Sequence, residues 1–141
     1  MKIDFTVYGK PQALKRHRTV KMGKFMRQYD PSSSDKQDFL AKCMENKPDK
    51  PIDEPLQLIL HFYFTRPKSH YRTGKNSHIE KDNAPMWHSS RPDCDNLAKF
   101  VCDALNGVYW RDDSLISSLI VKKLYSDKPR TRVVVEQIKF I

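Results

Sequence analysis

The sequence predicts an α+β or mixed α/β domain in which two main helices pack on one small mixed sheet. Two runs, at residues 3–8 and 56–64, have the alternating or continuously apolar patterns that are typical of strands. Two others space their apolar side chains as a helix does, after helix-start signals at residues 31–34 and 93. A chain of 141 residues has the length of a single domain, which we expect to cover residues 1–141.

The first half of the chain predicts a strand, a hairpin and a helix. In residues 3–8, apolar side chains alternate with polar ones, as in a half-buried strand. Residues 19–29 have Gly23 at their centre and are interpreted as a basic β-hairpin. After the Pro-Ser-Ser-Ser run at 31–34, apolar side chains recur at helical spacing, at Phe39, Leu40, Cys43 and Met44.

The second half predicts a strand, a long loop, a second helix and three more strands. Residues 56–64 are apolar and aromatic throughout, and residues 66–92 form a polar loop of a length that is usually functional or mobile. Residues 93–105 form a helix that Asn106 and Gly107 end, with a core stripe at Leu97, Val101, Ala104 and Leu105. Strands are expected at 108–110, 115–125 and 131–138, the last two joined as a hairpin.

The charge of the chain is strongly positive and unevenly distributed. Twenty-six Lys and Arg face 17 Asp and Glu, which gives a net charge of +9. Residues 1–30, the loop at 65–92 and the last twenty residues are basic, whereas residues 93–113 are acidic. Excess positive charge points to a polyanionic partner, most often nucleic acid. The acidic centre would repel such a partner unless cations intervene.

The composition of the chain argues against several classes of protein. The chain has no apolar run near the ~18 residues of a transmembrane helix and no secretory signal, so no membrane partner is expected. Three cysteines without paired spacing favour a reducing compartment, and we expect a cytoplasmic protein. Its four glycines form no phosphate-binding loop, and its five histidines lack the spacing of zinc ligands. No small-molecule substrate is expected.

Two pairs of carboxylates flank the predicted helix at 93–105. Asp93 and Asp95 stand at its start, and Asp112 and Asp113 follow the short strand after it. Our hypothesis is that this strand runs back along the helix and brings the two pairs into one pocket. Oxygen ligands of this kind suit Mg²⁺ or Mn²⁺ rather than zinc.

A lysine belongs to the same pattern. Lys99 follows Asp95 by four residues, which places both side chains on one helix face. There it could neutralise the carboxylate, contact a phosphate or stabilise developing negative charge. The alternative is that the aspartates only cap the helix and form turns, and that Lys99 makes an ordinary ion pair. The spacing alone leaves both interpretations open.

The acidic segment resembles one known family. It has Arg-Pro-Asp-Cys-Asp-Asn-Leu-Ala-Lys at 91–99, Asp-Ala-Leu-Asn-Gly at 103–107 and Asp-Asp at 112–113. This order resembles the RusA family of Holliday-junction resolvases, and so do Gly9-Lys10-Pro11 and a C-terminal segment that contains Lys122. Leu115 stands where the family often has Gln.

The resemblance implies a RusA-like fold and a homodimer that cuts four-way DNA junctions symmetrically with Mg²⁺, for which Mn²⁺ could substitute, in recombination and repair. Asp93, Asp95 and Asp113 would be catalytic metal ligands, Asp112 an auxiliary ligand and Lys99 the catalytic lysine. Branched DNA is the expected partner, and the basic segments are expected to bind it through Lys10, Lys15, Arg16, Arg18, Lys68, Arg72, Lys75, Arg91 and Lys122. Two alternatives remain: a non-catalytic protein that binds branched DNA, and an RNA-processing factor.

Overall fold

The computed structural model describes residues 1–16 and 18–139, and the side chain of Arg18 lies outside what it describes. Within these residues, two α-helices and six strands follow one another: β1 (Lys2–Tyr8), β2 (Arg18–Met22), β3 (Phe25–Tyr29), α1 (Ser33–Cys43), β4 (Leu56–Phe64), α2 (Cys94–Leu105), β5 (Ile116–Tyr125) and β6 (Arg130–Gln137). Short 3-10 turns lie between them at Met44–Asn46, Lys68–His70, Gly74–Asn76 and Asp113–Leu115.

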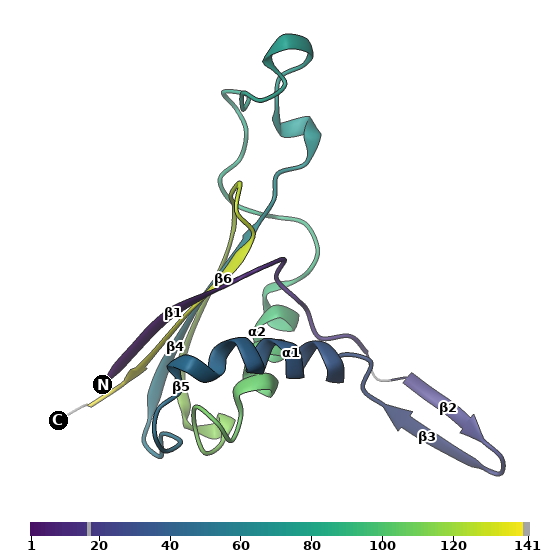
Figure 1. Ribbon diagram of the computed structural model, residues 1–141, viewed down its shortest axis with the longest axis vertical. Coiled ribbons are helices and arrows are strands. Elements are labelled where there is room, and N and C mark those ends of the chain that lie inside the picture. Colours follow the sequence, from purple (N-terminus) through teal and green to yellow (C-terminus); the bar gives the residue numbers. More distant parts are fainter. Residues whose placement is uncertain (17, 140–141) are drawn as a thin grey trace.

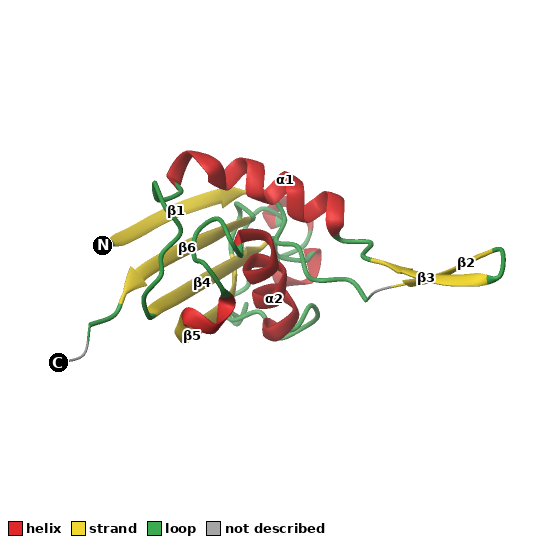
Figure 2. Cartoon of the chain, turned by 90° about the horizontal axis from the view of Figure 1, so that it is seen from below, coloured by secondary structure: helices red, strands yellow, loops and turns green. Residues whose placement is uncertain are grey.

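Four strands form the main sheet, in the order β1-β6-β4-β5. The pair β4–β5 is parallel, whereas β6 runs antiparallel to both β1 and β4. Both helices cover one face of this mixed sheet, and β2 and β3 form a separate ribbon that extends to one side (Figures 1 and 2). The predicted α+β class is confirmed.

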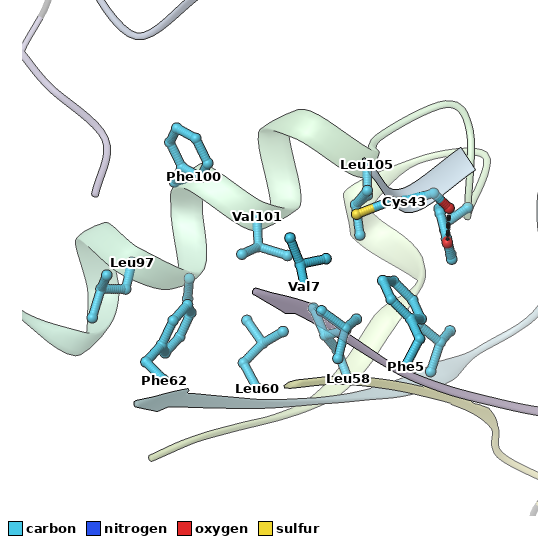
Figure 3. Close-up of a cluster of buried hydrophobic side chains, with 14 of the residues drawn as sticks. Phe5, Val7, Cys43, Leu58, Leu60, Phe62, Leu97, Phe100, Val101 and Leu105 are labelled. Carbon is cyan, nitrogen blue, oxygen red and sulfur yellow. Dashed lines mark hydrogen bonds between the residues drawn. The ribbon is translucent and has the colours of Figure 1, made fainter. Parts of the chain in front are cut away.

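The core lies between the two helices and the covered face of the sheet. Alternate residues of β4 are buried, and they meet the buried face of α2 that carries Leu97, Phe100, Val101 and Leu105 (Figure 3). Tyr109, which is fully buried, donates a hydrogen bond from its hydroxyl to the carbonyl of Cys43 and so joins the end of α1 to the segment after α2. This packing determines which face of α2 remains in solvent.

The C-terminal strands are arranged differently from our expectation. The predicted hairpin between the last two strands is wrong, because β4 lies between β5 and β6 and pairs with both. The chain crosses the end of β4 at the turn, where the Ser126 amide donates to the carbonyl of Phe64. A strand whose side chains are mostly apolar is most stable in the centre of a sheet, which explains why β4 is flanked on both sides.

The predicted strand at 108–110 is also wrong. The amides of Val108 and Tyr109 donate to the carbonyl of Leu105, and the Gly107 amide donates to that of Trp110, so the chain turns tightly after α2. Gly107 has a φ of +80°, which supports this turn and which glycine adopts without strain. Tyr109 and Trp110 are both fully buried. Burial of these two aromatic rings therefore holds the segment beneath the end of the helix.

The long loop between β4 and α2 extends beyond the sheet, away from both helices (Figure 1). Arg66 joins its two sides, because its guanidinium donates to the carbonyl of Pro85 over 2.6 Å and pairs with Glu80 at 3.2 Å. The end of the loop returns to the sheet, where Trp87 bridges to Leu124. Neither described helix is long and apolar enough to cross a membrane.

Candidate active site

The start of α2 presents three charged side chains to solvent. Asp93 is the N-cap residue with an extended backbone, Asp95 lies in the first turn and Lys99 follows one turn later. All three are exposed because the opposite face of the helix, with Leu97 and Val101, is buried in the core. The amphipathic pattern of α2 therefore determines where these charges lie, as the spacing predicts.

Two adjoining hollows lie against this end of α2. One, of about 640 Å³, is lined by Arg16, Arg91, Pro92, Asp93 and Asn96. The other, of about 380 Å³, shares Arg16 and Asn96 and adds Leu14, Lys15 and Lys99. The Leu14 amide donates to the Asn96 carbonyl over 3.1 Å, which attaches the N-terminal basic segment to the helix. Four cationic side chains, Lys15, Arg16, Arg91 and Lys99, thus line the hollows at this end of the helix, where Asp93 lies.

Lys123 holds the segment that leads into Asp93, a role that our sequence reasoning missed. Its ammonium group donates to the carbonyls of Ser90 and Pro92 over 2.7 and 2.8 Å. The His88 amide donates to the Lys123 carbonyl and the Tyr125 amide donates to the Met86 carbonyl, and these two bonds place the segment along β5. A lysine within an apolar strand was the available signal, because strand alternation puts Lys122 and Lys123 on opposite faces.

The second aspartate pair lies beyond the other end of α2. Asp112 caps the 3-10 turn, where it accepts from the Ser114 amide over 3.0 Å, and hydrogen bonding by Ser114 lowers the pKa of Asp112. Asp113 accepts from the Trp110 indole over 2.7 Å. Burial raises the pKa of Asp113 above its usual range; the indole bond opposes this rise, and the charges of Asp103 and Asp112 add to it.

The structure keeps the two pairs apart, so our hypothesis that they close into one pocket within the chain is wrong. The helix between them has 12 residues, and at 1.5 Å per residue it is about 18 Å long. The turn after α2 leaves Asp113 near Cys102 and Asp103. Burial, together with the negative charges of Asp113 and Asp103, raises the pKa of the Cys102 thiol to about 12. Across residues 1–16 and 18–139, no three His, Cys, Asp or Glu gather closely enough to hold a metal.

The four aspartates fit a magnesium site in their ligand chemistry but not in their positions. Carboxylate oxygens are the ligands that Mg²⁺ prefers, and Asp93, Asp95, Asp112 and Asp113 provide them. Their positions do not fit, because one chain brings at most two of these side chains to either end of α2. A complete set would need groups from outside the described chain.

The predicted DNA-binding residues lie in three regions. Lys15, Arg16 and Arg91 line the two hollows beside α2, and Lys10 lies near them in sequence on the N-terminal segment and is exposed. Lys68, Arg72 and Lys75 lie on the projecting loop, where Arg72 pairs with Asp82 at 3.1 Å. Lys122 pairs in register with His61 on the sheet face opposite the helices. The side chain of Arg18 lies outside the described part of the structure.

The pH dependence of stability is expected to depend on His88, whose ring stacks on Phe64 with centroids 4.1 Å apart. Burial and the charge of Lys123 lower the pKa of His88 from its usual 6.5. The unfolded chain therefore binds a proton more readily, so the free energy of unfolding falls as pH drops below about 6.5. Thermal denaturation between pH 7.5 and 5, values chosen to bracket about 6.5, should show Tm falling with pH.

His88→Phe keeps the stacking and removes the titrating group, so its Tm should fall less over the same range. The exposed His78→Phe is the matched control and should keep the decline of the parent chain. Equal declines in all three proteins would show that His88 does not carry this effect.

The start of α2 combines carboxylates with a basic hollow, and this arrangement suits a protein that acts on phosphodiesters. Comparison with known proteins leads to the same class. The family model described as "Endodeoxyribonuclease RusA" matches residues 8–136, which is most of the chain. The chain belongs to this family of nucleases. It is also 33% identical, over 96% of both chains, to the uncharacterized protein YqaN of Bacillus subtilis strain 168. A crossover junction endodeoxyribonuclease, rusA, of Lactococcus phage r1t is 28% identical over 78% of this chain and 77% of its own length.

Proposed function

We propose that the protein is a Mg²⁺-dependent endodeoxyribonuclease that resolves four-way DNA junctions by paired symmetric nicks in recombination and repair. The observation that carries the proposal is the exposed pair Asp93 and Asp95 beside a hollow lined by Arg16 and Arg91. The name of the phage relative, a crossover junction endodeoxyribonuclease, supports the choice of substrate.

The basic side chains would hold the DNA backbone over the aspartates. Arg16 and Arg91 line the hollow. The planar guanidinium group of an arginine can donate two parallel hydrogen bonds to the oxygens of one phosphate. Lys99 lines the adjoining hollow and would stabilise negative charge that develops on the scissile phosphate. These cations offset the repulsion between the DNA and the carboxylates.

A homodimer is part of the proposal, for two reasons. A four-way junction is nearly two-fold symmetric, and a dimer with the same symmetry presents two equivalent sites to it. One chain also places its aspartate pairs at opposite ends of α2. We therefore place the metal where Asp93 and Asp95 of one copy meet Asp113 and Asp112 of a second copy.

The test is incubation with a synthetic four-way junction whose strands carry distinct labels, with Mg²⁺, with Mn²⁺ or with a chelator. We expect nicks at matched positions in two opposite strands with either metal, and none with the chelator or on a linear duplex of the same sequence. Binding of the junction without nicking under any divalent ion would exclude the nuclease, and preference for structured RNA would favour an RNA-processing factor.

Arg16 should contribute to the electrostatic footprint on DNA. Each phosphate contact releases a counterion, so Arg16→Gln is expected to make the slope of log K against log salt shallower by roughly 0.9. Junction binding measured at several salt concentrations provides the slope. Arg72→Gln, on the projecting loop, is a useful comparison because Arg72 pairs with Asp82. An unchanged slope in Arg16→Gln would remove this residue from the footprint.

A further inference from the structure

The ribbon formed by β2 and β3 stands apart from the rest of the fold. It pairs only within itself among the described strands, and it extends away from both helices and the main sheet (Figures 1 and 2). Every residue from 19 to 29 is exposed. A two-stranded ribbon is only marginally stable alone in water. Its exposed side chains do not pack in the core, so their role has to be sought in contacts with a partner.

Strand register divides the ribbon into two unlike faces. The cross-strand pairs Val20–Arg27 and Met22–Phe25 share one face, which also carries Tyr29. Phe25 is 78% exposed and Met22 is 53% exposed, at the tip beside the turn. The opposite face carries Thr19, Lys21, Met26 and Gln28. One face is thus largely apolar and aromatic up to its tip.

The charge of the ribbon identifies the kind of partner. No Asp or Glu occurs between residues 5 and 29, and the ribbon carries Lys21, Lys24 and Arg27. A second copy of the ribbon would bring these like charges together, which opposes pairing between copies. Basic side chains around an apolar tip instead complement DNA, whose phosphates attract the cations while its base faces accept apolar contact.

The root of the ribbon lies at the candidate active site. Arg16, two residues before β2, lines the same hollow as Asp93. Each strand has five residues, so at about 3.4 Å per residue the tip extends about 17 Å from this root. That distance corresponds to roughly five stacked base pairs. A DNA arm that leaves the hollow on this side would therefore lie within reach of the ribbon.

We propose that this ribbon recognises the branch point of the DNA, with Phe25 and Met22 packing on the base pairs left without a stacking neighbour. Lys21, Lys24 and Arg27 would hold the flanking phosphates. In a continuous duplex the same contact has to unstack a base step, which disfavours it. The ribbon would thus distinguish branched from linear DNA. This inference rests on the proposed function.

The experiment compares Phe25→Ala with the control Gln28→Ala, which lies on the opposite face of the ribbon. Dissociation constants are measured in a chelator for a four-way junction and for a linear duplex of the same sequence. Loss of one base contact should weaken junction binding by about tenfold in Phe25→Ala, with duplex binding unchanged. Phe25→Trp should restore junction binding, and Gln28→Ala should match the parent chain.

A fluorescent 2-aminopurine at the branch point reports the contact directly. The parent chain should change its emission, and Phe25→Ala should not, whereas 2-aminopurine placed within an arm should respond equally to both. Equal junction affinities for the parent chain and Phe25→Ala would overturn the inference. The inference would also be overturned if Phe25→Ala sedimented as a monomer where the parent chain is a dimer, because the ribbon would then be a contact between subunits.

The two proposals fail in different ways. If the parent chain cuts no junction with Mg²⁺, the proposed function fails, whatever Phe25→Ala does in binding. If the parent chain cuts junctions and Phe25→Ala binds and cuts them equally well, only the inference about the ribbon fails. The Tm of each variant should equal that of the parent chain, because the ribbon lies outside the core.

Discussion

Mixed dimers of Asp95→Asn and Asp113→Asn chains are expected to regain nicking that neither variant has alone. If each site combines Asp95 of one copy with Asp113 of the other, a mixed dimer places both substitutions in one site and leaves the second site intact. Random exchange makes half of the dimers mixed, so about a quarter of the sites recover. Each variant alone should lose cutting by roughly 100- to 1,000-fold.

The number of strands that are nicked in each junction provides a second test of the shared site. A mixed dimer has one working site, so it should leave a junction nicked in one strand, whereas the parent dimer cuts two. Coexpressed chains and strand-specific labels measure both quantities. Asp95→Asn alone should bind the junction at least as tightly as the parent chain, because it removes a negative charge near the phosphates.

The matched control mixes Asp93→Asn with Asp95→Asn. These residues belong to the same end of α2, so every site of a mixed dimer contains one substitution and no recovery is expected. If Asp95→Asn and Asp113→Asn dimerise and also show no recovery, the shared site is wrong. Recovery in both mixtures would show that the substitutions do not act at the site.

Lys123→Met is expected to lower the cutting rate at saturating junction by about 100-fold while leaving the junction affinity unchanged. Its ammonium holds the carbonyls of Ser90 and Pro92, directly before Asp93, so its loss frees the segment that positions this carboxylate. Methionine keeps the apolar stem, which limits the effect on packing. Lys123→Arg keeps the charge and the donors and should retain part of the rate.

The neighbouring Lys122→Met is the matched control. Lys122 lies on the opposite face of β5, so its substitution should leave the rate at saturating DNA unchanged and alter at most KM and the salt dependence. Single-turnover kinetics separate the two parameters, and Tm identifies a folding defect. A fall in affinity alone in Lys123→Met would show that Lys123 contacts DNA instead of positioning Asp93.

Local patterns were sufficient to predict most of the elements. The apolar stripe of α2 and the polar residues at its start predict both the helix and the face that Asp95 and Lys99 share. The continuous apolar run of β4 predicts a buried strand. The order of strands was harder, because neighbouring strands in sequence often pair, whereas here the burial of β4 on both sides separates β5 from β6.

The site was predicted only in part, for a related reason. Motif spacing selected Asp93 and Asp113 as candidates, but it could not determine the path between them, which depends on where Tyr109 and Trp110 are buried. Lys123 was missed because its partners are backbone carbonyls, so the sequence shows a lysine in the strand but not the groups that it binds.

The separation of the aspartate pairs along α2 has a consequence for control in the cell. Under the proposed arrangement a newly made chain holds only half of each site, so it is harmless to DNA until it meets a second copy. At low protein concentration the number of complete sites then rises with the square of the concentration. A few stray molecules would leave the chromosome uncut, whereas a modest rise in synthesis would switch cutting on.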